Sequence, residues 1–127
     1  MNTKAKGTNA ERELVHMFWK ANFACFRAAG SGSTKYPCPD LIVGNNIRKL
    51  AIEVKISGKE YQHLTKKEID ELKQFSTMFG AEPWIAVKFD EWFFLNPEDI
   101  NETELNYSIT GEIAQRKGLS FNDLINF

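Results

Sequence analysis

The chain has 127 residues, of which 43% are hydrophobic and 26% are charged, and its formal net charge is −1. This length fits one domain with its own core, and no apolar run reaches the roughly 18 residues that a membrane-spanning helix needs. A membrane protein is therefore excluded, and because the polar first residues are unlike a signal peptide, we expect a cytoplasmic protein. Two cysteines, Cys25 and Cys38, are too few for a disulfide scaffold and too isolated for a zinc site.

The charge is unevenly distributed along the chain. Residues 1–55 carry nine Lys and Arg against four Asp and Glu, whereas residues 56–127 carry seven against thirteen. Attraction of a phosphate is decided by the charges within a Debye length of about 8–10 Å, so the first half can present a basic face although the whole chain is slightly acidic.

The N-terminal residues predict a basic arm followed by an amphipathic helix. Residues 1–7 are expected to form a flexible arm that carries Lys4 and Lys6, and the helix is expected from about Ala10 to Ala21. Glu11 falls on the core-facing side of this helix. It is either an acid favoured by the dipole of the first turn or part of a functional site.

A short strand and a loop of small residues come next. Residues 23–27 favour a strand, and residues 28–36 form a loop that is rich in Gly and Ser and leads directly to Asp40. The loop is either a solvated connector or a phosphate-contacting segment, in which case Ser31, Ser33 and Lys35 are the contacts.

A hairpin is predicted to bring two carboxylates together. Its strands are expected around residues 41–43 and 49–56, with a turn at residues 44–46. Because side chains two apart on a strand point the same way, Glu53 and Lys55 share one face and Ile52, Val54 and Ile56 fill the other. Asp40 should then lie near Glu53.

The second half predicts a helix and a second hairpin. Residues 57–64 are expected to form a polar connector, and Thr65 and Glu68 have the spacing of a capping box for a helix that ends near Phe79. Its buried side is predicted to comprise Ile69, Leu72, Phe75, Met78 and Phe79.

Strands are expected at residues 83–89 and 92–95, and beyond them a helical turn at Pro97 and a short helix at residues 121–125 after Ser120. This order of elements predicts an α/β fold in which helices flank a mixed sheet. The whole chain is expected to form one domain, with residues from about 96 onward the hardest to assign.

Asp40, Glu53 and Lys55 indicate a metal-dependent nuclease. Mg²⁺ prefers one or two protein carboxylates together with water and substrate phosphate, which Asp40 and Glu53 can complete. Lys55 would orient or activate the water and offset phosphate charge, and Glu11 would assist if its helix packs over the sheet. The alternative is a half-exposed strand whose Glu53 and Lys55 form a surface ion pair.

Several stretches in the same order resemble the archaeal Holliday junction resolvases. They are residues 11–14, 27–33, 39–45, 51–55 and 75–89, and the resemblance covers roughly residues 4–95. It implies a PD-(D/E)xK, restriction-endonuclease-like fold and a homodimer that makes paired nicks across a four-way DNA junction, in DNA recombination and repair. It also implies dependence on Mg²⁺, with Mn²⁺ as a substitute, and no organic cofactor.

The resemblance assigns roles to individual residues as well. Glu11, Asp40, Glu53 and Lys55 match the catalytic positions, and the backbone carbonyl of Val54 is a further metal ligand. Arg12, Arg27 and Ser31 match positions near the DNA, while Phe75 and Phe79 match aromatic positions that serve either the dimer surface or the core.

Two other functions remain in competition. The same fold and acids serve restriction-like and repair nucleases that cut linear or flapped DNA, and a DNA-binding module can keep the fold without cutting. A preference for branched DNA, or binding without cleavage, would discriminate between the three.

Overall fold

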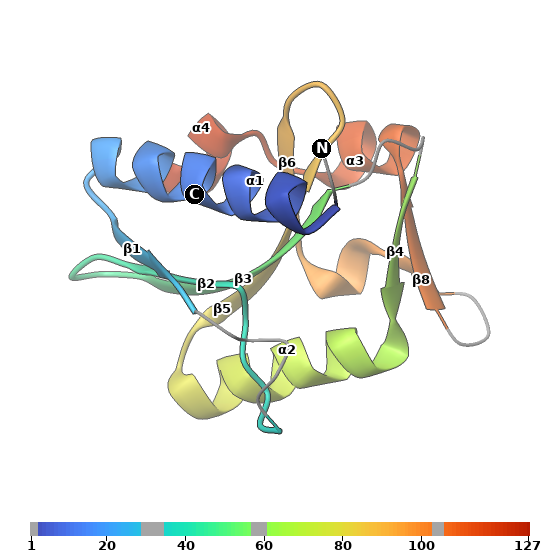
Figure 1. Cartoon of the computed structure of the whole chain (residues 1–127), viewed down its shortest axis with the longest axis horizontal. Helices are drawn as coiled ribbons and strands as arrows, with labels where there is room; N and C mark the ends of the chain where they lie inside the picture. Colours follow the sequence, from blue (N-terminus) through green and yellow to red (C-terminus); the bar gives the residue numbers. More distant parts are fainter. Residues whose placement is uncertain (1–2, 29–34, 57–60, 103–105) are drawn as a thin grey trace.

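The computed structural model describes residues 3–28, 35–56, 61–102 and 106–127 (Figure 1). Its helices are α1 (Thr3–Lys20), α2 (Lys66–Phe79), the short 3₁₀ helix η2 (Pro97–Asp99), α3 (Gly111–Lys117) and α4 (Phe121–Ile125). Its strands are β1 (Ala24–Arg27), β2 (Leu41–Gly44), β3 (Lys49–Ile56), β4 (Tyr61–Thr65), β5 (Glu82–Lys88), β6 (Trp92–Leu95), β7 (Asn101–Glu102) and β8 (Asn106–Thr110). Within the described ranges, no helix is long and apolar enough to cross a membrane.

The main sheet is mixed and has the strand order β1-β2-β3-β5-β6. The β2–β3 hairpin pairs Leu41 with Ile52, and the parallel pairing of β3 with β5 sets Glu53 opposite Ile85. The chain passes through β4 and α2 between these two strands, because parallel neighbours cannot be joined by a tight hairpin turn. The predicted mixed sheet flanked by helices is confirmed.

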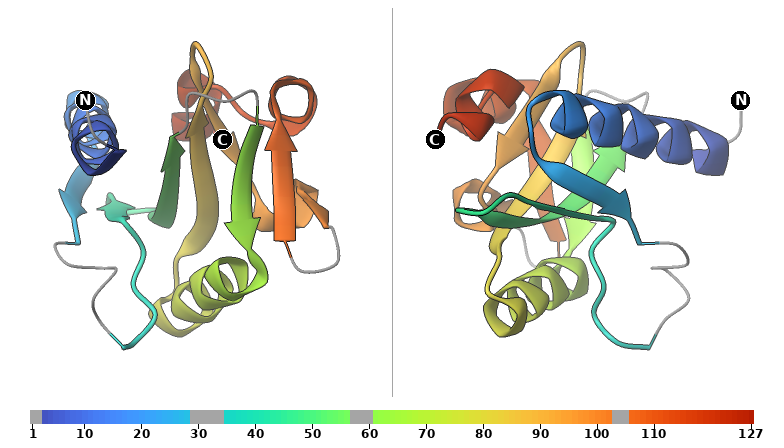
Figure 2. Two further views of the ribbon diagram at one scale, coloured as in Figure 1. Left: turned by 45° about the vertical axis from the view of Figure 1, so that its right-hand side comes forward. Right: turned by 90° about the vertical axis from the view of Figure 1, so that its left-hand side faces the viewer.

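The sheet separates two hydrophobic clusters. In Figure 1, α1 lies above the sheet and α2 below it, and the side views of Figure 2 show the same layers. The cluster on the α1 side contains Leu14, Phe18 and Ile52, all fully buried. The cluster on the α2 side contains Ile69 and Ile85, also fully buried. Strand β3 is buried on both faces, so its charged residues must lie where the core ends.

A second sheet, with the order β4-β8-β7, was not expected from the sequence. Residues 61–64 were assigned to a polar connector, but they form strand β4, which pairs with β8 from Tyr61 opposite Thr110 to Thr65 opposite Asn106. The sequence signal was weak because only one face of β4 enters the core, where Leu64 is buried. Strand β4 leads directly into α2, whose capping box is present as predicted.

Two further expectations are wrong. Helix α1 begins at Thr3 rather than near Ala10, so residues 3–7 are helical and not an arm. The spacing also predicts Met78 and Phe79 on the buried side of α2, but they are 80% and 49% exposed, because the last turn of the helix lies outside the packed cluster that contains Ile69 and Leu72. The end of α2 therefore carries apolar side chains to the surface.

Candidate active site

The β2–β3 hairpin brings Asp40 to the middle of β3. Asp40 immediately precedes β2, and its Oδ2 accepts a hydrogen bond from the backbone N–H of Val54 at 2.8 Å. Val54 lies between Glu53 and Lys55, so this bond fixes the Asp40 carboxyl beside both. The predicted proximity of Asp40 and Glu53 is confirmed.

Glu53 lies in an environment that opposes its charge. Its pKa is raised to about 9 by burial first, and then by repulsion from the neighbouring Asp40 carboxylate and by a hydrogen bond with it that favours the protonated form. Lys55 acts in the opposite direction but does not cancel these effects. Glu53 is therefore not the solvent-facing carboxylate of a surface ion pair, and a cation between it and Asp40 would relieve their repulsion.

Lys55 pairs with Glu68 rather than with Glu53. Its Nζ donates to Oε2 of Glu68, and the two side chains are 27% and 30% exposed. Glu68 is the third residue of α2 and the acidic member of the capping box. The lysine is thus held between the sheet and the start of the helix that covers this face.

Glu11 reaches the same edge of the sheet from α1. Its Oε1 accepts from Nε of Arg27, the last residue of β1, at 3.0 Å, and its side chain is 19% exposed. Burial raises the pKa of Glu11, the bond to Arg27 lowers it, and repulsion from Asp40 raises it, with a net increase. Because α1 packs over the sheet, Glu11 lines the same cavity as Asp40 and Glu53.

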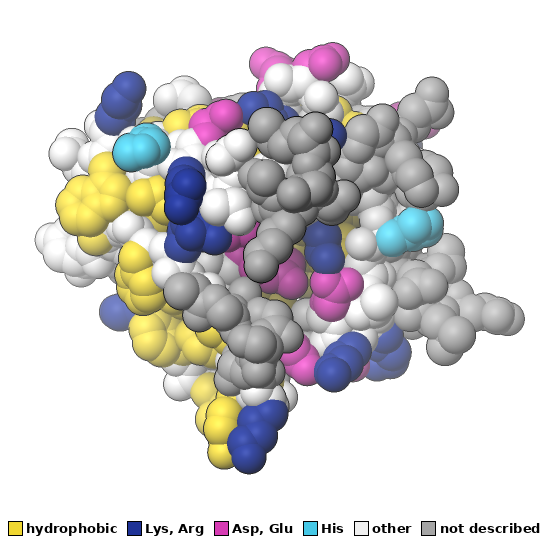
Figure 3. All heavy atoms as spheres, in the orientation of Figure 1, with side chains coloured by type: hydrophobic (Ala, Val, Ile, Leu, Met, Phe, Trp, Pro, Cys, Tyr) yellow, Lys and Arg dark blue, Asp and Glu magenta, His cyan; other side chains and the backbone are white. Residues whose placement is uncertain are grey.

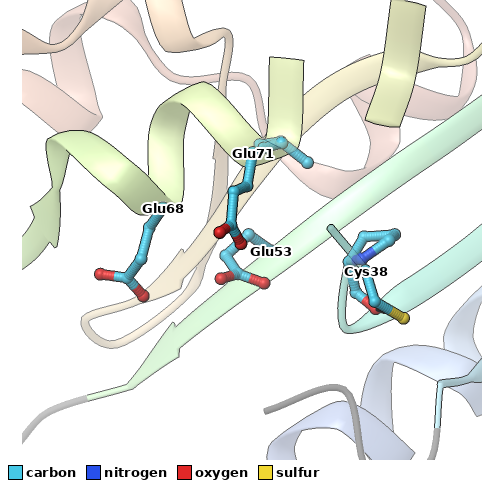
Figure 4. A pocket seen from close by; sticks show the side chains of 6 residues that line it. Cys38, Glu53, Glu68 and Glu71 are labelled. Carbon is cyan, nitrogen blue, oxygen red and sulfur yellow. Dashed lines mark hydrogen bonds between the residues drawn. The ribbon is translucent and has the colours of Figure 1, made fainter. Parts of the chain in front are cut away.

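These side chains open into one cavity of about 560 Å³. Its lining includes the four residues predicted to be catalytic and six more, which are Lys35, Cys38, Val54, Lys67, Glu68 and Glu71. Figure 4 shows Glu68 and Glu71 on α2 pointing toward the space in front of Glu53, with Cys38 across from them. Glu68, Glu71 and Lys67 were missed, because their position depends on how α2 packs on β3.

One candidate DNA contact lines this cavity, and the others lie on α1, at the end of β1 or outside the described residues. Lys35 lines the cavity, Arg12 and Lys6 are exposed on α1, and Arg27 is committed to Glu11. Ser31 and Ser33 lie outside the described residues, as does the side chain of Lys4. In Figure 3, acidic side chains gather near the middle of the face between α1 and α2, with Lys and Arg side chains beside them.

The donor set suits a hard divalent cation completed by water and substrate. Over the described ranges, no group of three or more His, Cys, Asp or Glu side chains is arranged to hold a metal unaided. Mg²⁺ does not need such a group, because it retains several waters and takes one or two carboxylates and substrate phosphate oxygens. Asp40 and Glu53 supply two carboxylates whose mutual repulsion a cation would relieve.

Comparison with known proteins gives consistent relatives. The family model described as archaeal Holliday junction resolvase (Hjc) matches residues 2–127. The crossover junction endodeoxyribonuclease Hjc of Archaeoglobus fulgidus is 42% identical over 129 residues, which cover 94% of this chain and 95% of the relative. The protein of the same name from Methanocaldococcus jannaschii is 38% identical, covering 85% of this chain and 78% of the relative.

Solved structures agree with the sequence relatives. The structure of Archaeoglobus fulgidus Hjc, described as a Holliday junction resolvase, superposes with a TM-score of 0.87 at 36% identity, covering 95% of this chain and 96% of the other. D212, a nuclease from a fusellovirus, superposes with a TM-score of 0.56 at 10% identity over 99% of this chain and 92% of its own. The second likeness shows the fold alone, which is of the restriction-endonuclease-like type.

Proposed function

The chain belongs to the archaeal Holliday junction resolvase family, and from this premise we propose that it is a structure-selective endonuclease that cuts four-way DNA junctions. The observation that carries the proposal is the bond from Val54 to Asp40, which gathers Asp40, Glu53 and Lys55 at one cavity. A relative named crossover junction endodeoxyribonuclease matches almost the whole chain, and the cavity is suited to phosphodiester hydrolysis. Both point to the same activity.

We further propose that the site works with Mg²⁺, for which Mn²⁺ can substitute. Asp40 and Glu53 would hold the cation, with the backbone carbonyl of Val54 and the Glu11 carboxylate as additional oxygen donors. When bound, such a cation activates water and neutralises charge on the phosphate. Without it, the pKa of Glu53 near 9 keeps this carboxyl largely protonated at neutral pH, so the cation must displace a proton.

The reaction adds water across one phosphodiester bond. A bond forms between the water oxygen and phosphorus, and the bond between phosphorus and the 3′ oxygen breaks. The water loses a proton and the 3′ oxygen gains one, so the products are a 5′-phosphate and a 3′-hydroxyl. The Lys55 ammonium orients the water and offsets charge on the phosphate, while Arg27 keeps Glu11 directed at the site.

Paired cutting requires two copies of the site, and the surface offers a place for a second chain. The α2 apolar patch consists of Tyr36, Pro37, Phe75, Met78 and Phe79. Phe75 and Phe79 stack with 5.2 Å between ring centroids, and Met78 and Tyr36 are 80% and 71% exposed. A two-fold dimer through this patch would present two identical sites to two symmetry-related strands.

The DNA would be held by basic side chains at the cavity and on α1. Lys35 lies at the cavity and Arg12 and Lys6 on the exposed face of α1, and Ser31, Ser33 and Lys4 are proposed as further contacts. Phosphate contacts of this kind orient the protein on its substrate without reading sequence. They explain how a slightly acidic chain can still bind nucleic acid.

Mapping the cuts in a labelled junction tests the proposal. Each strand of a four-way junction is end-labelled in turn and incubated with protein and Mg²⁺ beside a linear duplex of the same sequence. We expect paired nicks in two opposed strands, ends that a DNA ligase reseals without prior treatment, and an intact duplex. Cutting of junction and duplex at equal rates would replace the resolvase with a general nuclease, and binding without cutting would indicate a non-cleaving module.

A further inference from the structure

Both oxygens of the Glu68 carboxylate are engaged, and they face two different structures. Oε1 accepts from the backbone N–H of Thr65 at 3.0 Å and from its hydroxyl at 3.3 Å. Oε2 accepts from Nζ of Lys55. One half of the carboxylate therefore completes the start of α2, and the other half contacts a residue of the cavity.

The two contacts have different chemical requirements. A capping box needs only an acceptor at the third helical position, and Gln serves there as well as Glu. The contact with Lys55 is an ion pair and needs the negative charge. The hydrogen bonds to Thr65 and the ion pair both favour the ionised form, and together they outweigh burial, so the pKa of Glu68 is lowered and the carboxylate stays charged at neutral pH.

Lys55 needs an anchor if its ammonium is to act at a defined place. A lysine side chain is a flexible four-carbon stem that ends in a compact charge with three donors. Glu68 is itself fixed by the helix start, because its Oε1 accepts from the backbone N–H of Thr65 at 3.0 Å, a bond that does not need the Thr65 side chain. The ammonium is thus tied to a rigid element by one of its donors, which limits where it can meet a phosphate oxygen or a water.

We propose that Glu68 is a positioning residue of the nuclease site, which holds the Lys55 ammonium in the cavity where the scissile phosphate binds. The inference rests on the proposed function, since it assumes that this cavity cuts DNA. Asp40 and Glu53 would bind the cation, and Glu68 would act only through Lys55. The helix cap and the active site would therefore share one side chain.

Three variants separate the charge of Glu68 from its cap. Glu68→Gln keeps an acceptor for Thr65 but removes the charge that holds Lys55. Thr65→Ala removes the cap hydroxyl but leaves the contact between Lys55 and Glu68. Asp70→Asn is the matched charge control, because Asp70 lies on the same helix and pairs with a lysine, Lys66, at 2.9 Å on the exposed face.

The readouts are the single-turnover rate of junction cleavage at saturating protein and Mg²⁺, the Kd for the junction with a chelator, and the Tm. We expect Glu68→Gln to lower the rate about 10- to 100-fold, as loss of a partner that orients a site residue does, with little change in Kd or Tm. Thr65→Ala should lower the Tm and keep the rate below the unfolding transition. Asp70→Asn should leave both the cleavage rate and the Tm close to those of the wild type.

The outcomes distinguish this inference from the proposed function. If the wild-type protein cuts the junction and Glu68→Gln cuts at the same rate, Glu68 is only a helix cap and the inference is overturned. The same holds if the rate of Glu68→Gln falls no more than that of Asp70→Asn. If the wild-type protein cuts no junction, the proposed function fails and the inference fails with it.

Discussion

The Asp40 carboxylate accepts a hydrogen bond from the backbone N–H of Val54, with 2.8 Å between Oδ2 and N. This bond joins the residue before β2 to the centre of β3 and directs Asp40 to the point between Glu53 and Lys55. Its donor is a main-chain N–H, so the bond itself does not require a charge on either neighbour. An amide at position 40 can accept the same bond.

Asp40→Asn should therefore abolish cutting while preserving binding. The variant keeps the bond to Val54 and the shape of the site but loses a charged metal ligand. We expect single-turnover cleavage to slow by about 100-fold or more, the order found when one stabilising group is removed from an active site. Junction affinity, measured by fluorescence anisotropy with a chelator, should stay close to that of the wild type. A loss of affinity as large as the loss of rate would show that Asp40 serves binding.

Glu53→Gln should stabilise the metal-free protein at alkaline pH. The pKa of Glu53 is raised from 4.5 to about 9 in the folded state, so between these values the folded state holds a proton that the unfolded state has lost. The wild type therefore loses stability as pH rises from about 4.5 to about 9, whereas Gln does not titrate.

We expect the advantage of Glu53→Gln in free energy of unfolding to be near zero at pH 4.5 and to grow toward pH 9, by up to about 1.4 kcal/mol for each pH unit between the two pKa values. Denaturant titrations at several pH values with a chelator would measure it. Saturating Mg²⁺ should stabilise the wild type and reduce the difference. An advantage independent of pH would contradict the assigned environment of Glu53.

Arg27→Ala should affect the rate of cutting more than DNA affinity, and Arg12→Ala the reverse. Arg27 is tied to Glu11 at 3.0 Å, so its removal leaves Glu11 beside Asp40 without its partner and should slow cleavage about 10- to 100-fold. Arg12→Ala removes the same charge from an exposed position next to Glu11 in the sequence. Its loss should weaken junction binding and reduce the slope of log affinity against log salt by about 1. Equal effects of both variants would make Arg27 a simple phosphate contact.

Met78→Glu should separate the proposed dimer. Met78 is 80% exposed in the α2 apolar patch, and two-fold symmetry would place the new charge twice in one interface. Removal of an interface hot spot typically costs 2 kcal/mol or more, so we expect the dimer to weaken by roughly 30-fold or more in sedimentation equilibrium. Ile47→Glu is the control, because Ile47 is 82% exposed at the β2–β3 turn and lies outside the patch. If both variants sediment as the wild type does, the interface lies elsewhere.

Local patterns were sufficient for the elements that build the main sheet. Alternation along β3 predicted that Ile52 and Val54 face the core, and the capping box predicted the start of α2. The hairpin also predicted the contact region of Asp40 and Glu53, because its register is fixed by a short turn. Each of these features is decided by residues close together in the sequence.

Features that depend on distant packing were not predictable. Residues 61–65 form a strand because they pair with β8, which follows more than forty residues later in the chain. Their own polarity is mixed and does not indicate a strand. Lys55 and Glu68 are on different elements, and only the packing of α2 on the sheet makes them partners. The exposure of Met78 likewise depends on which turns of α2 pack against the sheet, since Ile69 and Leu72 belong to the buried cluster and Met78 does not.

We propose that this cavity cuts four-way junctions with a divalent cation held by Asp40 and Glu53. The most direct test incubates an end-labelled junction and its matched linear duplex with wild-type protein and with Glu53→Gln, each with Mg²⁺ and with a chelator. We predict cleavage only where the wild-type protein, the junction and Mg²⁺ are combined. With chelator, or with Glu53→Gln, the junction should be bound but uncut, and the linear duplex should stay intact throughout. Cleavage in chelator, or by Glu53→Gln at the wild-type rate, would contradict the claim.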